Sequence, residues 1–238
     1  MGAAGRQRNP VPEPAPESAR AYFDFALEQL KSQVEMMALR VDQALESSAR
    51  VLLTGDLALA DKVILGDNDI DEMFVSLSER CYDLLGRQSP VASDLRLVVS
   101  VLSVIQDLER SGDLCLRIVK LAPDHHLLSL NPDTFSILQD MAREATELFR
   151  LAIKAFSSQD LRLAHSLEQR DDAMDAYNAR LTEAIFAMEG RGAVPQAVQT
   201  MLAGRALERI ADHSVMVGER LRYLLTGDLG SLSKQIGP

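Results

Sequence analysis

The chain has 238 residues and a formal net charge of −10, with 47% hydrophobic and 5% aromatic residues and no tryptophan. Its length allows a buried core without disulfides or a structural metal. The negative charge argues against nucleic acid as a main ligand, because phosphate backbones are bound by concentrated lysine and arginine. No stretch approaches the roughly 20 apolar residues of a membrane-spanning helix, so we expect no membrane span.

The N-terminal segment differs in composition from the rest of the chain. Residues 1–20 carry several prolines among glutamate and arginine, and they lack the apolar region of a secretory signal. We predict a disordered, proline-rich tail over residues 1–20. Cys81 and Cys115 both fall on apolar helical stripes. We interpret them as reduced core residues of a cytoplasmic protein.

Apolar residues recur at helical spacing in six segments, and a composition rich in leucine and alanine favours an all-α fold. In chain order, we expect helices near residues 21–53, 56–86, 93–121, 134–157, 160–190 and 194–226. We assign Ser93 as the N-cap of the third helix. Asp94 follows it in the first turn, where a negative charge suits the helix dipole, and that role accounts for it.

The second half of the chain repeats the first. A shift of 104 residues aligns the second helix with the fifth, and a shift of 99 aligns the third with the sixth. A repeat holding three helices is too long for a solenoid module. The sequence therefore predicts two tandem antiparallel three-helix bundles related by internal duplication. The expected organisation is a tail (1–20), a first bundle (21–122), a linker (123–133), a second bundle (134–226) and a C-terminal tail (227–238).

Each repeat contains two acidic pairs at i, i+4 spacing. They are Asp67 with Asp71, Glu109 with Asp113, Asp171 with Asp175, and Glu208 with Asp212. Asp67, Glu109 and Glu208 stand on otherwise apolar stripes. A carboxylate that faces another helix is costly to ionise unless a positive partner meets it. Oxygen-only pairs from neighbouring helices suit hard or borderline cations, so we interpret the eight acids as ligands of divalent or trivalent metal ions such as Fe, Mn, Mg or Zn.

Two alternatives to this interpretation stay open. Acidic pairs at this spacing also occur on solvated helix faces, which would make the chain a plain helical scaffold, and the same acids could serve a carboxylate-bridged metalloenzyme. The sequence has no Glu-x-x-His motif, no nucleophile motif and no phosphate-binding glycine loop, which argues against an enzyme.

The neighbours of the acids carry further expectations. We expect His213 to be a polar surface residue, and Arg110 and Arg209 to pair away from the acids, because they point about 100° around the helix. Gly112 and Gly204 would leave room either for ions or for close helix approach.

Two stretches, "SPVASDLRLVVSVLSVIQDLERSGDL" at 89–114 and "AGRALERIADHSVMVGERL" at 203–221, resemble the PhoU family of accessory proteins in bacterial phosphate-specific transport. The similarity covers residues 21–226, and the paired Leu-Glu-Arg-x-x-Asp motifs carry it. The resemblance implies a cytoplasmic, non-enzymatic regulator that restrains phosphate uptake and represses the phosphate-starvation response. It implies two partners, the ATPase of the Pst transporter and a sensor histidine kinase, through which the protein could sit at the inner face of the membrane, and it implies a homodimer.

The family resemblance also bears on the acids. It implies multinuclear metal clusters on the bundle surface, held by Glu109 with Asp113 and by Glu208 with Asp212. The four aspartates at 67, 71, 171 and 175 lie opposite these pairs. The acids would then line a groove and not a closed core.

The chain departs from the family pattern in three respects. Ser111 stands where isoleucine is usual, which predicts a loss of apolar packing. Asp94 and Arg96 have no counterparts in the second repeat, where Ala193 and Pro195 fall. The proline-rich tail lies outside the pattern.

Overall fold

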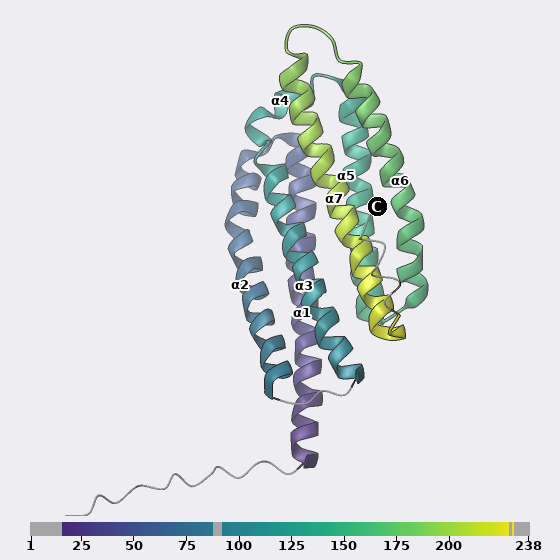
Figure 1. The fold of residues 1–238 in the computed structure, drawn as a ribbon. Coiled ribbons are helices and arrows are strands. Elements are labelled where there is room, and N and C mark those ends of the chain that lie inside the picture. The colour runs from purple at the N-terminus through teal and green to yellow at the C-terminus, as the bar shows by residue number, and fades with distance from the viewer. Residues whose placement is uncertain (1–15, 88–91, 229, 231–238) are drawn as a thin grey trace, which may run out of the picture.

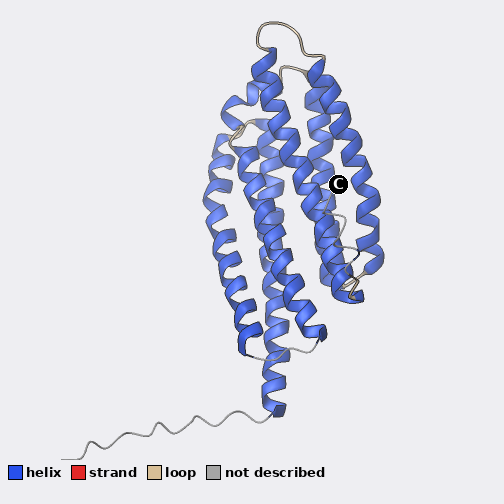
Figure 2. Ribbon diagram, in the orientation of Figure 1, coloured by secondary structure: helices blue, strands red, loops and turns tan. Residues whose placement is uncertain are grey.

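The structure, a computed structural model, describes residues 16–87, 92–228 and 230, and it is built from helices joined by short connections (Figure 1). The long helices are α1 (Pro16–Thr54), α2 (Leu57–Arg87), α3 (Ala92–Val119), α5 (Pro132–Ser158), α6 (Leu161–Phe186) and α7 (Ala193–Thr226). A 3₁₀ turn, η1 (Ala122–Asp124), and a one-turn helix, α4 (His125–Leu128), connect the two halves. The described residues contain no strand (Figure 2), which confirms the predicted all-α fold.

The six long helices form two antiparallel three-helix bundles that lie side by side (Figure 1). Helices α1 to α3 make the first bundle, and α5 to α7 make the second. Between the bundles, α3 packs along α7 and α1 packs along α5, while α2 and α6 lie on opposite outer sides. One continuous hydrophobic core runs through both bundles. The predicted duplication is therefore confirmed in three dimensions, and the two repeats are fused through a shared core.

Local sequence explains several helix ends. The side chain of Asn131 accepts hydrogen bonds from two backbone N–H groups at the start of α5, next to Pro132 at the first helical position. Asp160 caps α6 in the same way. Gly227 ends α7 with a left-handed backbone (φ 73°), a conformation that glycine adopts without strain. Cys81 and Cys115 are buried as expected, and burial raises the pKa of each thiol to about 12.

Some predicted boundaries were wrong. Helix α1 begins at Pro16, so residues 16–20, which we assigned to the tail, are helical, while residues 1–15 lie outside the described part of the chain. Helix α3 begins at Ala92, which places Ser93 inside the first turn and not at the N-cap. Helix α6 ends at Phe186, earlier than the predicted residue 190.

Two residues without counterparts in the second repeat tie separate helices together. The buried carboxylate of Asp94 accepts a hydrogen bond from Arg20 of α1 at 2.6 Å, so the first-turn role that we expected does not account for it alone. Arg96 Nε donates to the carbonyl oxygen of Leu224 at 3.3 Å, and its guanidinium lies beside Gly227. Arg96 of the first bundle therefore caps the last turn of α7 in the second bundle.

Candidate functional site

The first acidic cluster lies between α2 and α3. Asp67 and Asp71 come from α2, and Glu109 and Asp113 come from α3. Asp67 is half-buried and Asp71 is exposed, while the side chains of Glu109 and Asp113 retain 21% and 38% of their exposure. Asp67 lies near enough to Asp71 and Asp113 to be affected by their charges. The structure thus brings the four predicted residues together at the edge of a helix interface.

Burial and mutual repulsion both act on this cluster. Burial raises the pKa of Asp67, and the charges of the neighbouring aspartates raise it further, while Lys120 lowers it. Burial also raises the pKa of Glu109, followed by the charge of Asp113, and Arg110 opposes the shift. The folded chain therefore holds these carboxylates in surroundings that disfavour their negative charge.

The second acidic cluster repeats this arrangement between α6 and α7. Asp171 and Asp175 come from α6, and Glu208 and Asp212 come from α7. Burial raises the pKa of Asp171 to about 6, and the charges of Asp212 and Asp175 add to that shift. Burial likewise raises the pKa values of Glu208 and Asp212, with Arg205 opposing both shifts.

The arginines that follow the two glutamates behave differently from our expectation. Arg110 lies 3.6 Å from Glu109 Oε2 and 3.8 Å from Asp113 Oδ2, so it folds back over the first cluster. The prediction that it pairs away from the acids was wrong, because a long arginine side chain can reach along its own helix. Arg209 forms no ion pair with any residue that the structure describes.

Sequence reasoning missed two neighbours of Glu208. Arg205 pairs with one carboxylate oxygen of Glu208, and Asn178 Nδ2 donates to the other at 3.5 Å. Both could have been found from helical spacing. Arg205 lies three residues before Glu208, and Asn178 lies three after Asp175 on the face that carries the acids of α6.

The glycines beside the acids permit close helix packing. A Cβ atom added to Gly112 would lie 3.3 Å from Ile70 Cδ1, and one added to Gly204 would overlap Leu181 Cδ2. Of the two roles that we considered, the structure supports close helix approach, because apolar side chains of the facing helices occupy this space.

His213 is not the surface residue that we expected. Its side chain is 12% exposed, and its Nδ1 atom lies 3.1 Å from Oδ1 of Asp107, a buried residue of α3. The expectation failed because α7 packs against α3 of the other bundle. Ser111 is also buried, and its hydroxyl donates to the carbonyl oxygen of Asp107 at 2.9 Å, so the departure from isoleucine leaves no unsatisfied hydroxyl.

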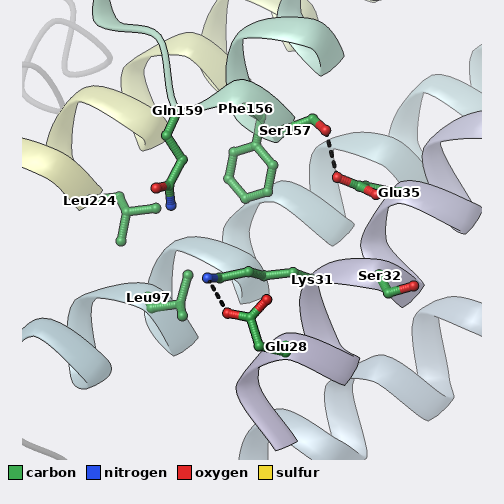
Figure 3. A pocket seen from close by; sticks show the side chains of 9 residues that line it. All are labelled: Glu28, Lys31, Ser32, Glu35, Leu97, Phe156, Ser157, Gln159 and Leu224. Atoms are coloured by element: carbon green, nitrogen blue, oxygen red, sulfur yellow. Dashed lines mark hydrogen bonds and ion pairs between the residues drawn. The ribbon is translucent and has the colours of Figure 1, made fainter. Parts of the chain in front are cut away.

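A pocket of about 280 Å³ lies between the bundles and is distinct from both acidic clusters (Figure 3). Lys31 pairs with Glu28 at 2.8 Å, and Ser157 donates to Glu35 at 2.5 Å. The charged side chains of the lining thus already have partners. None of the eight acids lines this pocket.

The acidic clusters have the type of donor atom that cations prefer, but their side chains are not arranged to coordinate a cation. Within residues 16–87, 92–228 and 230, no three His, Cys, Asp or Glu side chains lie close enough together to hold a metal ion. The donor set nevertheless consists of carboxylate oxygens, which hard cations prefer. Cation binding would therefore require the carboxylates of each cluster to turn toward one another. None of the described helices is both long enough and apolar enough to cross a membrane.

Comparisons with known proteins agree with the fold and with the duplication. A family profile described as "PhoU domain" matches residues 34–122 and 138–221. The chain is 32% identical to the phosphate-specific transport system accessory protein PhoU homolog 2 of Mycobacterium tuberculosis, over 87% of this chain and 98% of that protein. It is 30% identical to the PhoU homolog of Pseudomonas aeruginosa, over 86% of each.

Solved structures give the same result. The crystal structure of PhoU from Pseudomonas aeruginosa matches with a TM-score of 0.82 and 28% identity, over 87% of this chain and all of that one (100%). A phosphate transport system regulatory protein PhoU from Streptococcus pneumoniae matches with a TM-score of 0.79 and 29% identity, over 87% of this chain and 98% of that one.

Proposed function

This chain belongs to the PhoU family, and on that premise we propose that it restrains phosphate uptake and represses the phosphate-starvation response when phosphate is plentiful. It acts as an adaptor between the ATPase subunit of a Pst phosphate transporter and a sensor histidine kinase. It works in the cytoplasm as a homodimer and reaches the inner face of the membrane through these partners. The full-length similarity to proteins named as phosphate-transport accessory proteins supports this role.

The two acidic clusters bind metal ions as part of this function. Asp67, Asp71, Glu109 and Asp113 hold one set of divalent or trivalent ions, and Asp171, Asp175, Glu208 and Asp212 hold the other. The observation that carries this part is the recurrence of four mutually repelling carboxylates, three of them partly buried, at the same place in both bundles. A bound cation supplies the positive charge that keeps such acids ionised.

An adaptor fits the site better than a metalloenzyme does. His213, the histidine next to the second cluster in sequence, contacts Asp107 on the neighbouring bundle. The candidate ligands are therefore carboxylates alone, whereas carboxylate-bridged oxidase sites in helical bundles also use histidine.

Deletion of the gene tests the regulatory role. We expect phosphate-starvation genes to be expressed in high phosphate in the deletion strain, because the repressing adaptor is lost. The wild-type gene should restore repression, and Glu109→Ala/Glu208→Ala should fail to do so if the clusters serve signalling. Unchanged expression in the deletion strain would contradict the proposed function.

A further inference from the structure

A groove of about 310 Å³ runs along the seam where α3 meets α7. Its lining combines four apolar with four basic residues: Leu114, Leu121, Leu202 and Ala206, and Arg117, Lys120, Arg205 and Arg209. Leu202 is 52% exposed, and Val198 and Val194 continue its stripe along α7 at 50% and 75% exposure. The groove therefore presents apolar surface and positive charge together.

The positive charge of this groove stands out in a chain of net charge −10. Arg117 lies in the last turn of α3 and Lys120 directly follows the helix, where cations complement the helix dipole. That reason does not apply to Arg205 and Arg209, which lie well inside α7. Among the residues described, Arg117, Lys120 and Arg209 form no ion pair, and Arg205 pairs with Glu208. Three cations are thus available to a ligand.

The internal duplication supplies a built-in comparison for this groove. The shift of 99 that aligns α3 with α7 maps the groove onto the other half of the same seam. There, Lys120 aligns with Glu219, and Arg205 aligns with Gln106. Of the apolar residues, Leu114 and Ala206 align with His213 and Asp107, which form a polar pair. The duplicated fold therefore does not require a basic, apolar groove at this place.

We propose that the groove docks an amphipathic helix of a partner protein, one that carries Asp or Glu on both sides of its apolar stripe. The part of the groove on α3 begins at Leu114, and from there to the end of the helix at Val119 α3 rises about 7.5 Å at 1.5 Å per residue, so with Lys120 and Leu121 beyond it this wall matches one to two turns of a docked helix. Apolar residues at i and i+4 of that helix fill the floor, and its carboxylates reach Arg117 on one wall and Arg209 on the other. This inference rests on the proposed adaptor function and names the surface that one partner uses.

The surroundings of the groove favour a protein helix over a membrane surface. Lys120 affects the pKa of Asp67 in the first cluster, and Arg205 and Arg209 affect that of Asp212 in the second. An acidic cluster therefore borders the basic strip on each side. The basic strip is narrow and lies in the seam between α3 and α7, which suits a single helix better than a broad, flat lipid surface.

Binding measurements with the purified full-length chain test this proposal. The probes are the purified transporter ATPase and the cytoplasmic part of the sensor kinase. The groove variants are Arg117→Glu and Leu202→Ser, both at exposed positions; Arg117 lies one helical turn after Asp113, whereas Leu202 lies six residues before the nearest of the eight acids in sequence. The matched controls are Arg40→Glu on α1 and Leu65→Ser on α2, which change exposed residues outside the groove. Circular dichroism and thermal unfolding check that each variant folds.

We expect each groove variant to weaken the binding of one partner about tenfold or more, which is about 1.4 kcal/mol, while the controls bind like wild type. If Arg117→Glu lowers the melting temperature, Leu202→Ser decides the outcome, since a half-exposed leucine contributes little to the core. If both groove variants bind the partners with wild-type affinity, the groove is not the docking site, and the proposed adaptor function is unaffected. Failure of the wild-type chain to bind either partner would overturn both.

Two further outcomes would show that the groove binds something other than a partner helix. If wild type sediments with phosphatidylglycerol vesicles and the groove variants do not, the groove binds a lipid surface. Loss of self-association in the same variants, with partner binding unchanged, would assign it to a second copy of this chain.

Discussion

The two acidic clusters occupy equivalent positions in the two repeats but have different neighbours. In the first, Glu109 has one arginine at 3.6 Å, and Phe74 stands where the second repeat has Asn178. In the second, Asn178 and Arg205 both bond to Glu208, which is 13% exposed against 21% for Glu109. The duplication thus determines where the carboxylates lie, and the unduplicated neighbours determine their local electrostatics.

The different neighbours give the carboxylates of the two clusters different affinities for protons. Asp171 in the second cluster has a pKa of about 6, whereas the shift of Asp67 in the first is partly offset by Lys120. Protons compete with metal ions for carboxylates, so a ligand with a higher pKa loses its metal at a higher pH. We therefore expect the two clusters to differ in how their metal content depends on pH.

The seam between the bundles shows a second asymmetry, and it gives the largest expected effect. Asp107 and His213 form a polar pair at one end, and the aligned positions at the other end are Ala206 and Leu114. In His213→Leu, Asp107 would stay buried without its partner. We expect the free energy of unfolding in urea to fall by about 2 to 3 kcal/mol.

The double variant Asp107→Ala/His213→Leu is the matched control for this prediction. It copies the apolar pair from the other end of the seam, so we expect it to recover most of the loss. If the double variant is as unstable as the single variant, Asp107 and His213 are not energetically coupled. That result would contradict the view that an apolar pair can replace the polar pair at this end of the seam.

A smaller effect is expected from Asp171→Asn in metal-free protein. The folded-state pKa of Asp171 is raised, so the folded chain binds its proton more tightly than the unfolded chain does. Ionisation of Asp171 therefore opposes folding. This penalty is absent below pH 4, grows as the pH rises toward 6, and is complete above that. We expect Asp171→Asn to increase the free energy of unfolding at pH 7 by about 1 to 2 kcal/mol and to leave it unchanged at pH 4.

Asp67→Asn serves as the comparison in the first cluster. Its pKa is also raised, but Lys120 offsets part of the shift, so we expect the same sign and a smaller gain at pH 7. At saturating metal, we expect both amide variants to have a lower free energy of unfolding than wild type, because each variant loses a charged metal ligand. Equal stability of wild type and Asp171→Asn at pH 7 in chelator would contradict the account of the second cluster.

Much of the fold could be predicted from the sequence because it depends on spacing along the chain. Helical periodicity located six helices, and the repeat shifts paired them into two bundles. The same arithmetic placed Asp67 with Asp71 on one helix face, and Glu109 with Asp113 on another. The structure brings these two faces together.

Two of the contacts that could not be predicted join helices from different repeats. A periodic pattern shows that a helix has a buried face, but it does not show which helix covers that face. Arg96 therefore gave no sign that it caps α7, and His213 gave none that it meets Asp107. Both contacts follow from the packing of α3 on α7, which two separate three-helix patterns do not specify.

The most direct test of the metal-binding account is elemental analysis of protein purified without chelator. Wild type is compared with Glu109→Ala, Glu208→Ala and the double variant. We predict stoichiometric metal in wild type, loss of about half of it in each single variant, and loss of nearly all of it in the double variant. Wild-type protein without bound metal, or a double variant that keeps the full amount, would contradict the assignment of the acidic clusters as metal sites.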